Sequence, residues 1–379
     1  LVPAGRSHKG LCPFHQEKSP SFSVSSERGL FHCFGCKVSG DIFRFLELHE
    51  GTNFHDAVVR LAERAGVELE VSNPEEMVAE ARERRAKQEL YDANSIAASY
   101  FEVSLREHAH AELARQELSR RGLSLNDPAI EAVLREFSVG YAPHGWDGLA
   151  LHLRSHGISP AVAERAGLLV ARRSGSGYHD AFRHRLMVAI RDVQGRVVAF
   201  SGRRLLPVPG TPEPTDGQSE PPKYVNSRES LVYSKGHTLF GLHQARAAIR
   251  TAGQAVLVEG NFDLIAMHTW GLHHVVAPMG TAFTPEQGRM LRRFAGAVTL
   301  LFDADAAGKK ATLAAREVCL ECGLSARVAK LPAGKDPDEF FFFFGAQAMQ
   351  NLLAAARSLD EVLIDDFCSS IGEGSDLSA

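Results

Sequence analysis

The sequence reads Ala255-Val-Leu-Val-Glu259, then His274-Val-Val-Ala-Pro278, then Val298-Thr-Leu-Leu-Phe-Asp303, then Arg327-Val-Ala-Lys-Leu331. These four short apolar runs are separated by segments of helical length and period. Such alternation is typical of consecutive β-α-β units, whose mostly parallel sheet is buried on both faces. The stretch therefore predicts an α/β subdomain built on a mostly parallel sheet.

Acidic residues stand where the runs end. Glu259 closes the first run, and Asp303 and Asp305 follow the third. The carboxyl ends of parallel strands meet at one edge, where carboxylates repel one another unless they share protons or bind a cation. Oxygen ligands of this kind suit Mg²⁺ or Mn²⁺, and Asp336 and Asp338, after the fourth run, would add ligands for a second ion. The alternative for Asp305 alone is that it caps the helix that follows it.

The first 36 residues contain two closely spaced ligand pairs, Cys12-Pro-Phe-His15 and Cys33-Phe-Gly-Cys36. Two turns that each aim a pair of ligands at one point suit a closed tetrahedral site, so the spacing predicts one structural Zn²⁺ held by Cys12, His15, Cys33 and Cys36. Plain burial of these side chains is the alternative. His32 is a rival to His15, although its spacing fits less well.

Composition limits the class of protein. The formal net charge of −4 argues against a protein that coats nucleic acid through its overall charge, but it does not exclude a local cationic groove. No apolar run approaches the roughly 20 residues of a membrane span, and the first residues lack a secretory signal pattern. We therefore expect a cytoplasmic protein without a membrane segment.

A concentration of arginine marks residues 182–204. Basic and apolar residues alternate there around a turn at Gly195, which predicts a β-hairpin. The hairpin carries six arginines and one aspartate, whereas a merely solvated strand face usually mixes both signs. We therefore predict a phosphate-binding surface that includes Arg183, Arg185 and Arg203.

Several motifs resemble those of one family. Glu259-Gly-Asn-Phe-Asp263 and Asp303-Ala-Asp-Ala-Ala-Gly308 resemble the two signatures of the TOPRIM fold, which primases of the DnaG type share with topoisomerases and some nucleases. Further segments are similar to primases in particular: Cys12 to Phe22, Phe31 to Cys36, Ala277 to Thr284 and Lys335 to Glu339. Ala307 stands where type IA topoisomerases usually carry an acid. The chain thus resembles DnaG-type bacterial DNA primases from Cys12 to about Glu339.

The resemblance implies an enzyme that synthesises short RNA primers on single-stranded DNA from ribonucleoside triphosphates. It implies catalytic roles for Glu259, Asp303 and Asp305, and contacts to nucleic acid or nucleotide at Arg121, Lys223, Tyr224 and Lys235. A replicative helicase is an expected partner for the family, but its docking domain is not visible here. We expect a monomer.

The predicted organisation is an α+β multidomain chain with an N-terminal zinc ribbon. The expected parts are a zinc-binding domain (1–72), a helical linker (73–90), a mixed α/β N-terminal subdomain of the polymerase core (91–252), a TOPRIM subdomain (253–334) and a C-terminal helical segment (335–379). The run Phe340 to Phe344 has no explanation at this level, because five successive rings cannot all face one core.

Other functions stay open. The same acids can direct water instead of a hydroxyl group, which would make a metal-dependent TOPRIM nuclease. A non-catalytic, zinc-containing protein that binds single-stranded DNA is a third class, although it would have no use for the acids. A topoisomerase fits least, since no strand-passing region follows the TOPRIM segment.

Overall fold

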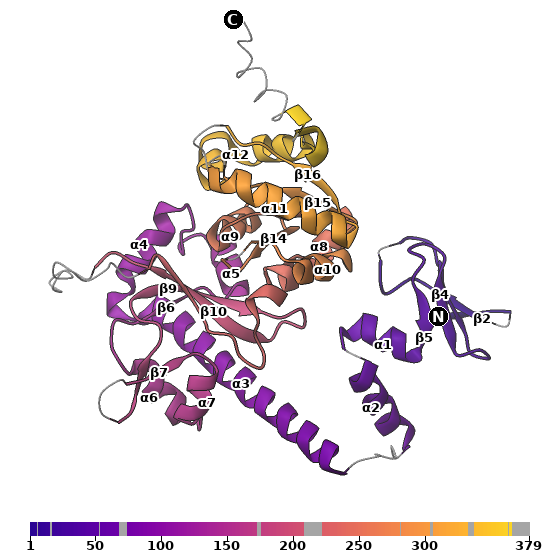
Figure 1. The fold of residues 1–379 in the computed structure, drawn as a ribbon, viewed down its shortest axis with the longest axis horizontal. Coiled ribbons are helices and arrows are strands. Elements are labelled where there is room, and N and C mark those ends of the chain that lie inside the picture. Colours follow the sequence, from indigo (N-terminus) through magenta and orange to yellow (C-terminus); the bar gives the residue numbers. More distant parts are fainter. Residues whose placement is uncertain are drawn as a thin grey trace, which may run out of the picture. The chain divides into compact units, whose positions relative to one another are not determined.

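A computed structural model describes residues 1–5, 7–15, 17–52, 54–67, 74–172, 176–207, 222–280, 282–303, 306–332, 337–362 and 364–365 (Figure 1). The chain divides into two compact units, Leu1–Arg85 and Ala86–Ala379. No helix in the described part of the chain combines the length and the apolar character needed to cross a membrane.

The first unit is a five-stranded antiparallel sheet followed by two helices. In sheet order these are β1 (Val2–Ala4), β2 (Ser7–Gly10), β3 (Phe22–Ser25), β4 (Leu30–Cys33) and β5 (Ser39–Asp41), then α1 (Ile42–Glu50) and α2 (Phe54–Ala65). Its core is small. Phe14, Phe22, Phe31 and Phe45 pack ring against ring beside the buried Cys12 and Cys33.

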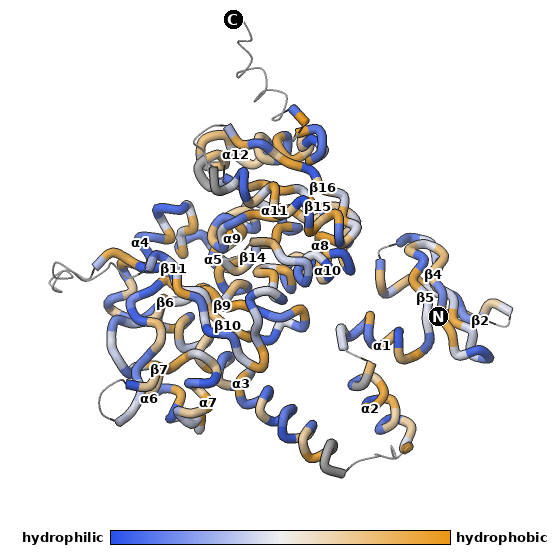
Figure 2. The backbone as a smooth tube through the Cα atoms, viewed as in Figure 1, coloured by the Kyte–Doolittle hydropathy of each residue, from blue (hydrophilic) through white to orange (hydrophobic). Residues whose placement is uncertain are grey.

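Helix α3 (Pro74–Glu107) runs without a break through the predicted linker and the helical pattern after it. Residues 78–85 are exposed, and hydrophilic residues recur along this part of the helix (Figure 2). From Leu90 onward its apolar face enters the core of the second unit, where Ala93, Ala97 and Phe101 are buried. One helix therefore has a solvated half and a packed half.

The second unit contains a four-stranded antiparallel sheet in the order β11-β10-β9-β6. Its strands are β6 (Gly140–Ala142), β9 (Arg185–Arg191), β10 (Val197–Arg204) and β11 (Tyr224–Asn226). The β9–β10 pair confirms the predicted hairpin. Around it lie α4 (Glu112–Arg120), α5 (Pro128–Glu136), α6 (Gly148–Ser155), α7 (Pro160–Arg165) and the small hairpin β7 (Leu169–Ala171) with β8 (Tyr178–Asp180).

A six-stranded sheet confirms the predicted α/β layer. Its order is β12 (Leu239–Phe240), β14 (Val275–Pro278), β13 (Gln254–Leu257), β15 (Ala297–Leu300), β16 (Ser325–Val328) and β17 (Arg357–Ser358). The four inner strands are parallel, and the two edge strands are antiparallel. The associated helices are α8 (Leu242–Ala252), α9 (Asn261–Thr269), α10 (Pro285–Arg292), α11 (Ala306–Cys322) and α12 (Pro337–Ala354).

Alternate residues of the inner strands enter two different cores. Val256 and Val275 pack on the side of α9, whereas Leu257 and Val276 pack on the side of α8, α10 and α11. Burial on both faces explains why these strands read as continuous apolar runs rather than as an alternation.

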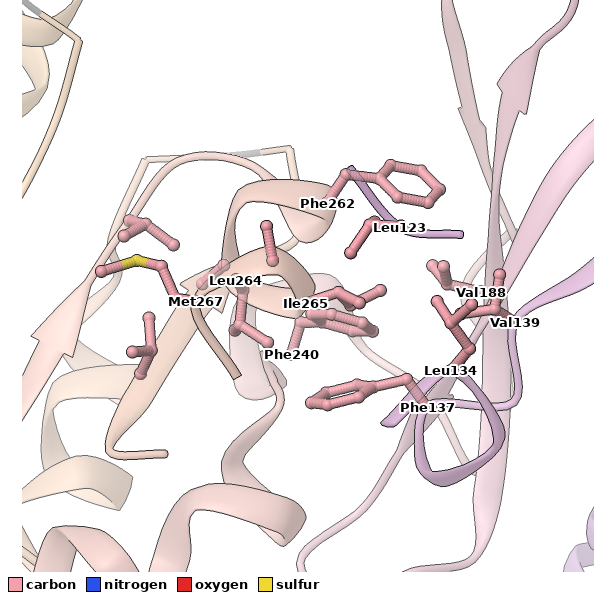
Figure 3. Close-up of a cluster of buried hydrophobic side chains, with 14 of the residues drawn as sticks. Leu123, Leu134, Phe137, Val139, Val188, Phe240, Phe262, Leu264, Ile265 and Met267 are labelled. Carbon is pink, nitrogen blue, oxygen red and sulfur yellow. The ribbon is translucent and has the colours of Figure 1, made fainter. Parts of the chain in front are cut away.

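Helix α9 joins the parallel sheet to the antiparallel one. It directly follows Glu259 and Gly260, and nearly all of its residues are buried. Figure 3 shows Phe262 and Ile265 of α9 beside side chains from the antiparallel sheet and its helices, which include Leu123, Leu134, Phe137, Val139 and Val188. The two sheets therefore share one core, and the end of β13 is held next to the arginine-rich hairpin.

The phenylalanine run is divided between core and surface in α12. Phe340 is buried, and the ring of Phe341 stacks on Trp270 with 3.3 Å between ring centroids. Phe343 and Phe344 are exposed, and the helical path is interrupted at Gly345, where φ is 79°. The first part of the run thus anchors α12 on α9.

Candidate active site and metal centre

Two strand-end acids meet at one edge of the parallel sheet. Glu259 follows β13 and Asp303 follows β15, and these strands are adjacent and parallel. The backbone N–H of Asp303 donates to Oε1 of Glu259 at 3.4 Å. Glu259 is exposed and Asp303 is partly exposed, so both carboxylates face solvent at this rim. The structure therefore brings the backbone of Asp303 to the Glu259 carboxylate, and the joint role of the two acids as metal ligands stays a prediction.

The other predicted acids are less fully described. Asp305 and Asp336 lie outside the described residues. Asp338 lies in the first turn of α12, and only its backbone is described.

Two glycines let the backbone approach these acids closely. A Cβ atom at Gly308 would lie 2.0 Å from the carbonyl oxygen of Asp303, and one at Gly260 would lie 1.9 Å from Oδ2 of Asp263. At Gly308 the obstacle is backbone, so a side chain has no room there, whereas the Asp263 side chain next to Gly260 can turn away. The first turn of α11 is therefore packed directly on the loop that carries Asp303.

Three of the predicted binding residues come together beside α9. Arg121 follows α4, Arg203 lies in β10 and Tyr224 begins β11. Nη1 of Arg203 donates to the Tyr224 hydroxyl at 2.7 Å, and Cζ of Arg121 lies 5.3 Å from the centroid of the Phe262 ring. Burial raises the pKa of Tyr224, while the charge of Arg203 and its hydrogen bond oppose this shift. A cationic cluster thus lies against the helix that follows Glu259.

Glu117 holds this cluster and was missed in the sequence. Its Oε1 accepts a hydrogen bond from Nε of Arg121 and another from Nε of Arg203, each 2.9 Å long. Burial alone would raise the pKa of Glu117, but hydrogen bonds from Arg120 and Arg121 and the charges of Arg121 and Arg203 lower it to about 2. A glutamate four residues before an arginine on a helix is common, so the sequence gives no distinctive signal.

The remaining predicted residues lie in different surroundings. Nη1 of the buried Arg185 donates to the backbone carbonyls of Gly202 and Pro222, and Cζ of Arg183 lies 3.5 Å from the ring centroid of the exposed Trp146. Lys223 is exposed. Lys235 is half-buried, and its carbonyl accepts a hydrogen bond from the Gln287 side chain of α10.

Two other arginines of the hairpin are held by neighbouring groups. Arg191 donates to Oγ of Ser138 at 2.8 Å, and Arg196 pairs with Asp192 at 2.7 Å. The hairpin is therefore not one uniform cationic face.

The predicted zinc ligands converge in the first unit. The ligand atoms of Cys12, His15, Cys33 and Cys36 all lie within 4.8 Å of one another. Sγ of Cys12 is 3.9 Å from Sγ of Cys36, and Sγ of Cys33 is 3.7 Å from Nδ1 of His15. Such separations suit a tetrahedral metal with ligand distances of about 2.0–2.3 Å. His15 rather than His32 belongs to this group.

Glu17 orients the histidine of this group. Its Oε2 lies 3.2 Å from Nε2 of His15, which leaves Nδ1 directed at the cysteines. Its Oε1 accepts hydrogen bonds from the backbone N–H groups of Cys12 and Ser21. A carboxylate on the outer nitrogen of a metal-binding histidine fixes the orientation of the ring.

Known proteins share these features. Three family models match the chain: a CHC2 zinc finger at residues 1–77, the N-terminal domain of the DNA primase catalytic core at 100–246, and a Toprim-like domain at 256–341. The crystal structure of the Aquifex aeolicus primase, with its zinc-binding and RNA polymerase domains, is 33% identical and covers 98% of this chain and 84% of that one, with a TM-score of 0.65. This chain belongs to the DnaG-type bacterial primase family.

Two further primases are similar to it. The DNA primase of Deinococcus radiodurans is 39% identical over 364 residues, which are 96% of this chain and 58% of that protein. A DnaG primase catalytic domain, whose structure was solved bound to single-stranded DNA, is 32% identical with a TM-score of 0.64 and covers 76% of this chain and 84% of that one. The chain spans little more than half the length of the curated primases that it matches.

Proposed function

We propose that the chain forms the zinc-binding and RNA polymerase part of a DNA primase, which joins ribonucleotides into short primers on a single-stranded DNA template. The observation that carries the proposal is the contact between Glu259 and Asp303 at one sheet edge, beside a cluster of arginines. Membership of the primase family, and the single-stranded DNA bound to one relative, support it. This activity belongs to chromosome replication in the bacterial cytoplasm.

The acid rim fits a hard divalent cation, because both carboxylates are open to solvent and the backbone of Asp303 contacts the Glu259 carboxylate. Glu259 and Asp303, together with Asp305, would hold Mg²⁺ or Mn²⁺, and Asp336 and Asp338 would add ligands for a second ion. When bound, such cations polarise phosphate oxygens and offset the charge that develops on the attacking and leaving oxygens.

The protein's own groups position the reactants. In the proposed reaction the 3′-hydroxyl of a primer or first nucleotide attacks the α-phosphorus of a ribonucleoside triphosphate, and pyrophosphate leaves. Alternatively, Glu259 would act as the general base that accepts the hydroxyl proton. Phosphate contacts are assigned to two sets of residues: Arg121, Arg203 and Tyr224 beside α9, and Arg183, Arg185, Lys223 and Lys235 elsewhere. Positioning of this kind carries most of the catalysis in phosphoryl transfer.

The zinc ribbon has a separate role in the proposal. Cys12, His15, Cys33 and Cys36 would hold one structural Zn²⁺, which joins the two ligand-bearing turns and stabilises a core too small to fold well alone. We assign to this unit the task of helping to contact the template.

Primer synthesis tests the proposal. The full chain is incubated with single-stranded DNA, ribonucleotides and Mg²⁺ or Mn²⁺, and the products are separated by length. We expect wild-type protein to make short RNA, and Asp303→Asn and Glu259→Gln to lower its rate by a hundredfold or more, on the order of the loss for a group that stabilises transition-state charge.

A matched control is Glu164→Gln, which removes an exposed carboxylate from α7 and should act like the wild type. Wild-type activity in Asp303→Asn would contradict the assignment of the acids. Cleavage of the DNA without incorporation of ribonucleotides would replace the proposal with a nuclease.

A further inference from the structure

The arginine cluster is built around one carboxylate. Glu117, Arg121 and Arg203 have side chains that are 17%, 14% and 12% exposed, so their two mutual hydrogen bonds are sheltered from water. Arg120 also contacts Glu117, at 3.1 Å, but it is 66% exposed. Exposed pairs contribute little to structure, whereas sheltered bonds to a charged acceptor hold side chains in one orientation.

Glu117 links segments that are distant in sequence. Arg203 lies 86 residues beyond it, in the hairpin, and carries the link onward to Tyr224 of β11. Arg121 carries it to Phe262, in the first turn of α9. Since α9 starts two residues after Glu259, the position of the Glu117 carboxylate sets where both arginines lie relative to the acid rim.

The negative charge of Glu117 keeps two positively charged guanidinium groups close together. Two guanidinium groups that share one oxygen through their Nε atoms would repel each other if that oxygen lost its charge. One carboxylate against three guanidinium groups leaves the cluster net positive, so it still attracts a polyanion. The carboxylate therefore orders the arginines without cancelling their charge.

Resting on the proposed primase function, we propose that Glu117 is a positioning residue for nucleic-acid binding, which holds Arg121 and Arg203 so that both contact backbone phosphates of the template or primer beside the acid rim. A negative side chain thereby strengthens the binding of a polyanion. This is the opposite of what its charge alone would do.

The test compares two glutamates of α4. Glu112→Gln removes the same charge as Glu117→Gln, but Glu112 is 60% exposed and pairs with Arg115 within the helix. Binding of a fluorescent single-stranded DNA oligonucleotide to the full chain is measured by anisotropy over a series of salt concentrations. We expect Glu117→Gln to bind about tenfold more weakly, and Glu112→Gln to bind as tightly as the wild type or slightly more tightly.

The salt dependence separates positioning from a folding defect. Each phosphate contact that is lost should make the slope of log K against log salt shallower by about 0.7, whereas a smaller folded fraction leaves the slope unchanged. In addition, the double variant Glu117→Gln with Arg203→Gln should bind DNA less weakly than the product of the two single losses in affinity would predict, since both substitutions act on the same contact. An unchanged slope, multiplicative losses, or a Glu117→Gln variant that binds as well as Glu112→Gln would each overturn the inference.

The wild type tests the underlying function separately. If wild-type protein neither binds the oligonucleotide nor makes primers, the proposed function fails and the inference fails with it. If the wild type does both and Glu117→Gln behaves like Glu112→Gln, only the inference fails.

Discussion

Single side chains at strand ends carry the proposed chemistry, and the backbone decides where they lie. The Asp303 N–H donates to the Glu259 carboxylate, so the Glu259 side chain is tied to the loop that carries Asp303. A substitution that removes a charge there should leave the buried strands unchanged, because both side chains face solvent. Loss of function at these residues can therefore be separated from loss of fold.

The buried His268 should make the free energy of unfolding depend on pH. It is 2% exposed in α9, its Nε2 has no hydrogen-bond partner, and its ring packs edge-on against Phe137. Burial, reinforced by His273, lowers the pKa of His268 to about 4. Because its pKa in the unfolded chain is higher, about 6.5, the folded state binds fewer protons, and stability falls as the pH drops from 6.5 towards 4.

The expected loss over this range is about 3 kcal/mol of unfolding free energy. Urea unfolding of the full chain can follow it through Trp146 and Trp270, which both lie in the second unit. His268→Leu should flatten the dependence on pH, whatever its own effect on stability. An equally steep dependence in that variant would show that other groups are responsible.

At the scale of elements, the helices and strands predicted from the sequence match the structure where buried residues follow a regular pattern. The inner strands of the parallel sheet follow from their short continuous apolar runs, and the β9–β10 hairpin follows from the alternation of basic and apolar residues around the turn at Gly195. The change in composition near residue 90 predicted a boundary between a linker helix and the polymerase core, but α3 continues through it. The absence of proline and glycine between Pro74 and Gly122 is compatible with this continuous helix. Glu117 could not be found in this way, because its partner Arg203 is brought to it only by the packing of α4 on the hairpin.

The packing of α11 on the loop that carries Asp303 depends on Gly308. With a Cβ atom only 2.0 Å from the Asp303 carbonyl oxygen, Gly308→Ala must move that loop. We expect primer synthesis to fall on the order of a hundredfold, as for other small displacements of reacting groups, while the fold is kept. The measurement is the rate of ribonucleotide incorporation together with the thermal unfolding midpoint.

The matched control is Gly296→Ala, just before β15, where an added Cβ meets nothing within 4 Å. It should keep wild-type activity. Equal activity in the two alanine variants would show that the loop tolerates the displacement, and that its close packing on α11 is not needed for function.

At the scale of the whole molecule, the two units depend on different forces. The second unit has extended apolar cores on both faces of its parallel sheet. The first unit has a few aromatic rings and two buried cysteines. So small a core contributes little stability by itself, so the zinc group should decide the stability of the first unit only.

Removal of zinc should therefore unfold the first unit selectively. After treatment of the full chain with a chelator, limited proteolysis followed by mass spectrometry should give new cleavages before residue 86, and the tryptophan fluorescence of the second unit should be unchanged. Cys33→Ser should have the same effect without the chelator. Continued protection of residues 1–85 in metal-free protein would contradict the structural role of the metal.

The central claim is that acids from neighbouring strands form one site for a divalent cation. Titration of the zinc-loaded full chain with Mn²⁺, followed by the electron paramagnetic resonance signal of the free ion, tests it most directly. Wild-type protein should remove Mn²⁺ from solution, and Asp303→Asn should bind it more weakly, on the order of a hundredfold. Equal Mn²⁺ binding by both proteins would contradict the claim.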